Sequence, residues 1–178
     1  MQINELSLSG CYLFKPGAFE DSRGRFVKSF VASQLKINGL RTDFVEQYYS
    51  TSKAGVIRGM HFQTPPHDHA KLVYCAAGAV TDVILDLRRK SPTFGNTYAI
   101  NLTASSGHAI YIAAGIAHGF MAVEEGTIMV YNVTSEYAPD YDKGIRWDSF
   151  GFEWGIDAPI ISERDKNFPK LEEFKSPF

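Results

Sequence analysis

Short segments rich in valine, isoleucine and aromatic residues recur along this chain, and they constrain its fold more than any other feature. The segments include RFVKSFV (25–31), KLVYCAAGAVTDVILDLR (71–88), TYAINLTA (97–104) and HAIYIAAGIAHGFMAVEEGTIMVYNVTSEY (108–137). Such residues favour strands. Turn signals separate them roughly every 10 to 25 positions: Pro65-Pro66, Ala77-Gly78, Ser91-Pro92, Ser106-Gly107 and Glu125-Gly126. This rhythm predicts a mainly β fold, an antiparallel sandwich or barrel.

Helix is expected in only two short stretches at the periphery of the fold. One is VASQLKINGL (31–40), which Gly39 ends, and the other is SERDKNFPKLEEF (162–174), which Pro169 interrupts. Within the strand segments, AVTDVILDL (79–87) alternates in part. The alternation predicts one strongly buried face, carrying Val83, Leu85 and Leu87.

Length and charge limit the class of protein. The chain has 178 residues, so we expect a single domain over 1–178. Its net charge of −2 provides no overall basic field that would draw it to nucleic acid or to an anionic membrane. No apolar run approaches the roughly 20 residues of a membrane crossing, and the N-terminus lacks a signal peptide pattern. We therefore expect a soluble, cytoplasmic protein, with Cys11 and Cys75 as buried free thiols.

The histidines suggest a site, but the pattern argues against a metal. His67 and His69 alternate as two ligands on a strand would, yet Lys71 stands where a carboxylate ligand is usual. We therefore expect loop histidines after the Pro-Pro turn and no metal. His61 shares a short segment with Arg58 and Lys71, so an imidazole and two cations could converge on an anionic substrate that loses a proton. The alternative is a hydrogen-bonded core histidine.

The segment GHAIYIAAGIAHGFMA (107–122) has the glycine and histidine spacing of the second motif of cupin barrels. Ala113 and Ala122 stand where that motif usually has proline and asparagine. The spacing indicates a cupin-like jelly roll, and the missing ligand again speaks against a metal.

Six segments together resemble one known family. They are FEDSRGRFVKSF (19–30), SKAGVIRGMHFQTPPHDHAKLV (52–73), GAVTDVILDLRRKSPTFG (78–95), AAGIAHGF (113–120), YAPDYDKGIRW (137–147) and PIISERD (159–165). In order along nearly the whole chain, these segments are similar to the dTDP-4-dehydrorhamnose 3,5-epimerase family. The resemblance implies a cupin-type jelly roll without cofactor or metal. It also implies a homodimeric isomerase that epimerises a nucleotide-linked 4-keto-6-deoxyhexose.

The resemblance also implies roles for individual residues. The family's general base corresponds to His61, the carboxylate that orients it to Asp165, and the acid on the opposite face of the sugar to Tyr131. Lys71 corresponds to the residue near the 4-keto oxygen. The implied substrate contacts are Arg58 and His118 at the pyrophosphate and sugar, Tyr137 stacked on the base, and Phe19, Arg23 and Phe26 supplied by the partner subunit.

The chain departs from the family at three positions expected near the nucleotide base. Lys28, Glu46 and Tyr48 stand where the family usually carries Glu, Gln and Asn. A donor such as Lys28 would suit cytosine, whereas an acceptor such as Glu46 would suit the N3–H of thymine or uracil. The expected substrate is a dTDP-sugar, with a CDP-sugar as the alternative.

Three functions are compatible with these residues. The first is 3,5-epimerisation in deoxysugar biosynthesis of the rhamnose type. The second is a related enzyme that inverts only C3 or only C5. The third is a non-catalytic jelly roll that binds a sugar nucleotide, but such a module does not need a base, its orienting carboxylate and an acid.

Overall fold

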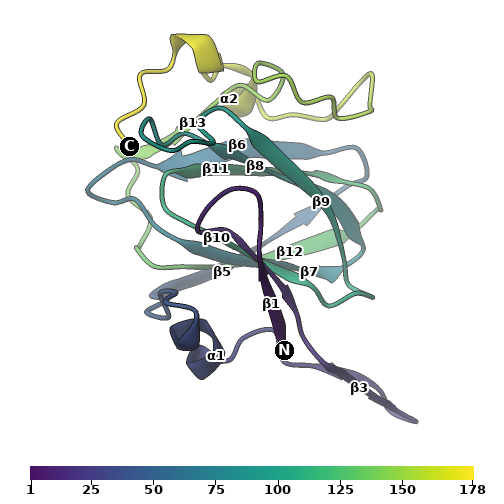
Figure 1. Cartoon of the computed structure of the whole chain (residues 1–178). Coiled ribbons are helices and arrows are strands. Elements are labelled where there is room, and N and C mark those ends of the chain that lie inside the picture. The colour runs from purple at the N-terminus through teal and green to yellow at the C-terminus, as the bar shows by residue number, and fades with distance from the viewer.

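Two antiparallel sheets stacked face to face make up most of the computed structural model, which describes residues 1–178 (Figure 1). The six-stranded sheet has the order β1 (Gln2–Glu5), β2 (Tyr12–Lys15), β10 (Ala109–Ile112), β7 (Lys71–Ala77), β12 (Thr127–Val133) and β5 (Glu46–Ser52). The five-stranded sheet has the order β13 (Asp142–Gly144), β6 (Ile57–Gln63), β11 (Ile116–Ala122), β8 (Ala79–Asp86) and β9 (Thr97–Thr103).

The expected turns connect these strands. At Pro65-Pro66, Ala77-Gly78, Ser106-Gly107 and Glu125-Gly126 the chain passes from one sheet to the other, and at Ser91-Pro92 it stays within one sheet. Repeated crossing between two antiparallel sheets is the connectivity of a jelly roll. The prediction of a mainly β fold is therefore confirmed.

A separate hairpin and three short helical elements complete the fold. The hairpin consists of β3 (Ala18–Asp21) and β4 (Gly24–Val27) and projects away from both sheets in Figure 1. The strand expected over 25–31 therefore ends at Val27. The helices α1 (Ala32–Ile37) and α2 (Glu163–Lys166) and the 3₁₀ helix η1 (Leu171–Glu173) lie within the two predicted stretches, and Pro169 separates the last two. None of the helices has the length and apolar character that a membrane crossing requires.

Three apolar clusters stabilise this arrangement. The largest lies between the two sheets and includes Val73, Ile84, Ile110, Phe120 and Met129. A second covers the outer face of the five-stranded sheet, where Val83, Leu85 and Leu87 pack against Ile145, Phe150 and Trp154 of the C-terminal part. A third packs Leu35 of α1 on the outer face of the six-stranded sheet.

The burial of β8 corrects the expectation for residues 79–87. All residues of β8 except Thr81 are buried, so both faces are covered and not one alone. The face with Val83, Leu85 and Leu87 is buried, as expected, beneath the C-terminal segment, which is seen in Figure 1 above the five-stranded sheet. The other face of β8 lies against the six-stranded sheet, where Val80 and Ile84 join the first cluster, so Asp82 and Asp86 on that face are also buried, at 0% exposure.

Candidate active site

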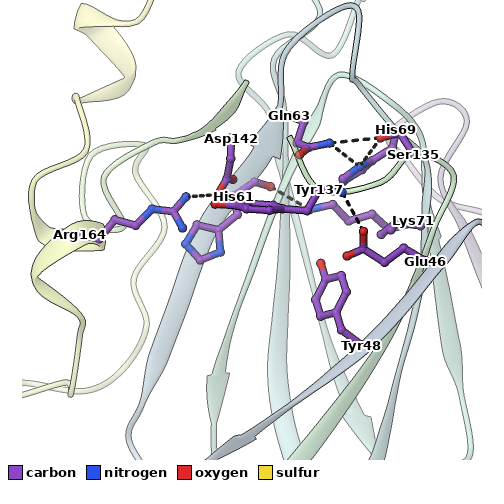
Figure 2. Close-up of a pocket in the computed structure, with 11 residues that line it drawn as sticks. Glu46, Tyr48, His61, Gln63, His69, Lys71, Ser135, Tyr137, Asp142 and Arg164 are labelled. Carbon is purple, nitrogen blue, oxygen red and sulfur yellow. Dashed lines mark hydrogen bonds and ion pairs between the residues drawn. The ribbon is translucent and has the colours of Figure 1, made fainter. Parts of the chain in front are cut away.

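Two adjoining cavities open at one end of the sandwich. The inner cavity has a volume of about 190 Å³ and is lined by Tyr48, Ser50, Arg58, His61, Lys71, His118, Phe120 and Tyr131. The outer cavity has a volume of about 290 Å³ and is lined by Glu46, Tyr48, His61, Gln63, His69, Lys71, Val133, Ser135, Tyr137, Asp142 and Arg164 (Figure 2). Strands of both sheets contribute, so the jelly roll itself assembles the site.

His61 and Asp165 form a hydrogen-bonded pair at the boundary of these cavities. His61 Nε2 lies 2.9 Å from Asp165 Oδ1, which leaves the other ring nitrogen, Nδ1, available to accept a proton. Burial by itself would raise the pKa of the Asp165 carboxyl, but hydrogen bonds from His61 and from the Gly59 N–H outweigh burial and lower it. The ionised carboxylate holds the imidazole in the tautomer that carries its proton on Nε2.

Local structure explains why these two residues meet although they are far apart in the sequence. Val56 forms a parallel bridge with Ile160, which aligns the C-terminal segment with the start of β6. The Ser162 hydroxyl then accepts a hydrogen bond from the backbone N–H of Asp165 and caps α2. Asp165 is thereby held against β6, with 4% of its surface exposed.

Gly59 provides a further hydrogen bond to this carboxylate. Its N–H donates to Asp165 Oδ2 over 3.1 Å. A Cβ at this position would lie 2.5 Å from the Gly119 Cα on the neighbouring strand, and the φ of +138° is one that residues with side chains rarely adopt. Only glycine fits here, two residues before His61.

A second histidine–aspartate pair lies beside the first. His118 is the cross-strand partner of His61, and its Nε2 lies 2.8 Å from Asp82 Oδ2. His118 is only 3% exposed, whereas the side chain of His61 is 32% exposed. The greater access of His61 makes it the better placed base, while His118 forms part of the cavity wall.

Tyr131 lies on β12 at the inner cavity and is 7% exposed. Burial raises the pKa of its phenol well above the ordinary value, so the hydroxyl keeps its proton at neutral pH. Its ring stacks on Tyr48, with centroids 4.7 Å apart, and meets the edge of His118 at 5.9 Å.

Two cations complete the inner cavity. Lys71 donates from Nζ to the backbone carbonyl of His61 at 3.0 Å, and burial lowers the pKa of its ammonium to about 8. Arg58 donates from Nε to the Ser52 hydroxyl and from Nη2 to the Thr51 carbonyl, both at 3.0 Å. These bonds fix the guanidinium at the edge of the cavity and leave further N–H groups for an anion.

In the outer cavity, Tyr137 lies across the pocket in Figure 2, and its backbone N–H donates to Glu46 Oε2 at 2.7 Å. Gln63 anchors the same segment, because its Oε1 accepts the N–H of Ala138 at 2.6 Å. On the opposite side Arg164 Nη2 pairs with Asp142 Oδ2 at 2.6 Å.

Sequence reasoning assigned no role to several of these lining residues. Gln63 could have been found, because it follows His61 by two residues on one strand and therefore shares its face. Arg164 adjoins Asp165 in the sequence, but no pattern marks its side chain as pointing to the cavity. The structure also places His69, expected as a loop histidine, within hydrogen-bond distance of Gln63 and Ser135.

His67 and His69 have separate surroundings. His67 lies against Tyr141, with ring centroids 4.4 Å apart, whereas burial and the nearby Lys71 charge lower the pKa of His69 to about 3. No group of three or more His, Cys, Asp or Glu side chains is arranged to hold a metal ion.

Four expected contact residues lie outside the cavities of a single chain. Phe19, Arg23 and Phe26 line a separate hollow on the hairpin, and Lys28 lines another at its base. Phe19 and Phe26 are 70% and 57% exposed, and Arg23 pairs only with Asp21 of the same hairpin. Within one chain, therefore, the hairpin contributes nothing to the site.

Comparison with known proteins identifies the family to which the chain is similar. The family model for dTDP-4-dehydrorhamnose 3,5-epimerase matches residues 5–173. The chain is 38% identical to the enzyme of that name from Methanothermobacter thermautotrophicus, over 94% of this chain and 92% of the relative. The crystal structure of the Bacillus anthracis enzyme with TDP and PPi bound matches with a TM-score of 0.92 and 35% identity, over 96% of this chain and 99% of the other.

A further solved structure is that of a 3'-monoepimerase from Streptomyces bikiniensis in complex with dTDP-quinovose. It matches with a TM-score of 0.89 and 31% identity, over 94% of this chain and 86% of the other. The cupin-like jelly roll expected from the sequence is thus confirmed. Since the family model and the relatives cover almost the entire chain, the protein belongs to the dTDP-4-dehydrorhamnose 3,5-epimerase family.

Proposed function

We propose that this protein epimerises C3 and C5 of a dTDP-linked 4-keto-6-deoxyhexose, in deoxysugar biosynthesis of the rhamnose type. Membership of the family supports the reaction class. One observation carries the assignment to residues: His61, held by Asp165, opens onto the same cavity as Tyr131 and Lys71.

The reaction begins with removal of a proton next to the keto group. His61 Nδ1 accepts that proton, and the carboxylate of Asp165 stabilises the resulting imidazolium through Nε2. A proton α to a ketone has a pKa of about 20 and an ordinary imidazole about 6.5, so the transfer is uphill by roughly 18 kcal/mol. The enolate therefore needs strong stabilisation.

Lys71 supplies that stabilisation in this proposal. Lys71 lines the inner cavity and is 5% exposed, and its ammonium is held by the carbonyl of His61. A fixed cation in a largely water-free site favours the developing oxyanion without reorganising as charge forms. Tyr131, which keeps its proton, then protonates the carbon from the opposite face, and the stereocentre is inverted.

We also propose a homodimer that shares its active sites. The exposed phenylalanines of the β3–β4 hairpin are apolar groups that a second copy would cover, and Arg23 would add a cation to the partner's nucleotide. Residues 19–28 then complete the site of the other subunit.

A second candidate is inversion at a single carbon. The similar Streptomyces bikiniensis protein is a 3'-monoepimerase, and the same base, acid and cation would serve either reaction. Which carbons react depends on how the sugar ring turns within the cavity.

The test is incubation of dTDP-, UDP-, CDP- and GDP-linked 4-keto-6-deoxy sugars in D₂O, with deuterium at C3 and C5 read by NMR. Deuterium at both carbons with inversion at both is the expected result for the dTDP-sugar. Deuterium and inversion at one carbon only would establish the mono-epimerase. No exchange with any of the sugars would overturn the enzymatic assignment.

A further inference from the structure

We propose that Tyr48 is a positioning residue, which holds the ring of Tyr131 so that its hydroxyl reaches one face of the bound sugar. This inference rests on the proposed function, because it concerns the acid of the same site. It assigns to Tyr48 a role other than the expected contact with the nucleotide base.

The two tyrosines are neighbours on adjacent strands. Tyr48 of β5 and Tyr131 of β12 are directly opposite in the antiparallel register, so their side chains lie on the same face. Their rings are nearly parallel, with an angle of 15° and a centroid distance of 4.7 Å. Aromatic pairs of this geometry attract each other beyond simple burial, and they restrict ring orientation.

Tyr48 also separates Tyr131 from the outer cavity. Tyr48 lines both cavities and is 41% exposed, whereas Tyr131 lines only the inner one and is 7% exposed. Figure 2 shows the Tyr48 side chain at the lower side of the outer pocket, with its hydroxyl directed into it. Its ring therefore covers the acid on the side from which water would enter.

This screening is consistent with the electrostatics of the pair. Burial is the main cause that raises the pKa of Tyr131, and the neighbouring Tyr48 adds to it. Partial burial also raises the pKa of Tyr48 itself, to about 12, so both phenols stay neutral at physiological pH. The asparagine that the family usually has here could not supply a stacking ring.

The experiment compares inversion with deuterium exchange in three variants. In Tyr48→Ala we expect the ratio of inversion to exchange to fall roughly three- to tenfold, because His61 still exchanges the proton while Tyr131 is no longer held. Tyr48→Phe keeps the ring and should keep the ratio. Tyr49→Ala is the matched control, since the neighbouring Tyr49 is 71% exposed and lines neither cavity.

Two results would overturn the proposal. A ratio unchanged in Tyr48→Ala would mean that the stack does not position the acid. A parallel fall of exchange and inversion, with a raised KM, would make Tyr48 a substrate contact. Thermal unfolding of each variant shows whether it has folded.

A second measurement needs no substrate and so does not depend on the proposed function. Ring-labelled tyrosine NMR, assigned with Tyr131→Phe, follows the titration of Tyr131. We expect no titration up to about pH 11 in the wild type and Tyr48→Phe, and titration below that pH in Tyr48→Ala, where water reaches the phenol. Identical behaviour of Tyr131 in all three proteins would contradict the screening. A wild type that epimerises nothing would refute the proposed function alone.

Discussion

The Lys71 ammonium donates a hydrogen bond to the main-chain carbonyl of His61 over 3.0 Å. The Lys71 cation and the proposed base, His61, are therefore held relative to each other, although they lie on strands of different sheets. Two donor hydrogens of the ammonium remain for a ligand. The substrate's keto oxygen and its acidic C–H can thus be engaged by groups whose separation is fixed before binding.

We expect His61→Asn to abolish deuterium exchange at both carbons while nucleotide affinity stays within about threefold of wild type. The imidazole transfers the proton but carries little of the binding free energy. Asp165→Asn should show a large but incomplete loss, because the base remains without its orienting carboxylate. NMR in D₂O and calorimetry with dTDP measure the two effects.

His108→Asn serves as the control for this test, since His108 lines neither cavity. It should exchange at the wild-type rate. Wild-type exchange in His61→Asn would show instead that the second pair, His118 and Asp82, contains the base.

Tyr131→Phe should separate exchange from inversion. His61 can still remove a proton and return deuterium on its own face, so label enters while the configuration is retained. The product is analysed for deuterium and configuration in the same NMR spectrum. Loss of exchange in parallel with inversion would show that Tyr131 stabilises the enolate or holds the sugar.

Much of this site could be predicted from the sequence. For the parts that could not, there is a physical reason. His61 and Lys71 lie on strands of the two facing sheets, as alternation indicates, whereas Arg58 joins them because a register shift in β6, opposite His118 and Phe120, breaks the alternation between Arg58 and His61. The hydrogen bond between His61 and Asp165 depends on the β-bridge at Ile160 and on the helix cap at Ser162, and no periodicity in the sequence predicts either. Resemblance to a family supplied that pair.

The fold, too, has parts that the sequence predicts and parts that it does not. Turn residues and strand composition predicted the sandwich, since both are local signals. The expected burial of Val83, Leu85 and Leu87 is confirmed, but the residues that cover them, Phe150 and Trp154, belong to a segment without regular structure, whose packing no periodicity reveals. The stack of Tyr48 on Tyr131 likewise depends on the register of two strands far apart in the chain.

The kcat/KM of the enzyme should fall as pH rises through about 8, because burial lowers the pKa of Lys71 to about that value and only the ammonium stabilises the enolate. In Lys71→Arg the fall should move to higher pH, since a guanidinium does not titrate in this range. A pH–rate profile from 6 to 10 with both proteins tests this. An unchanged profile in Lys71→Arg would assign the fall to another group.

The same pKa predicts an effect on stability. The folded pKa of Lys71 lies below its ordinary value of 10.5, so between about pH 8 and 10.5 the unfolded chain binds more protons than the folded one. The contribution of Lys71 to the free energy of unfolding therefore rises with pH in that window. Comparing urea unfolding of wild type and Lys71→Met across it isolates this contribution.

Mixing two inactive variants tests the shared site. Arg23→Ala removes the hairpin cation proposed to reach the partner's nucleotide, and His61→Asn removes the proposed base. A heterodimer of the two has one site in which both residues are intact if the hairpin crosses to the partner. We expect activity to return after mixing and subunit exchange. The activity of Arg25→Ala, a variant of the same hairpin, is compared with that of Arg23→Ala to show that the effect is specific to position 23. Monomeric protein by light scattering, or no recovery despite exchange, would refute the arrangement.

Nucleotide preference decides between the two substrates left open by the sequence. Glu46 lies in the outer cavity and accepts the Tyr137 N–H through one oxygen, so its other oxygen can accept the N3–H of thymine or uracil. Lys28, the donor that would favour cytosine, lies at the base of the hairpin. We therefore expect calorimetry to give dTDP a Kd more than tenfold lower than that of CDP, a difference of about 1.4 kcal/mol. Glu46→Ala should reduce this preference. The reverse order of affinities, abolished in Lys28→Ala, would establish a CDP-sugar as the substrate and place Lys28 of the partner subunit at the base.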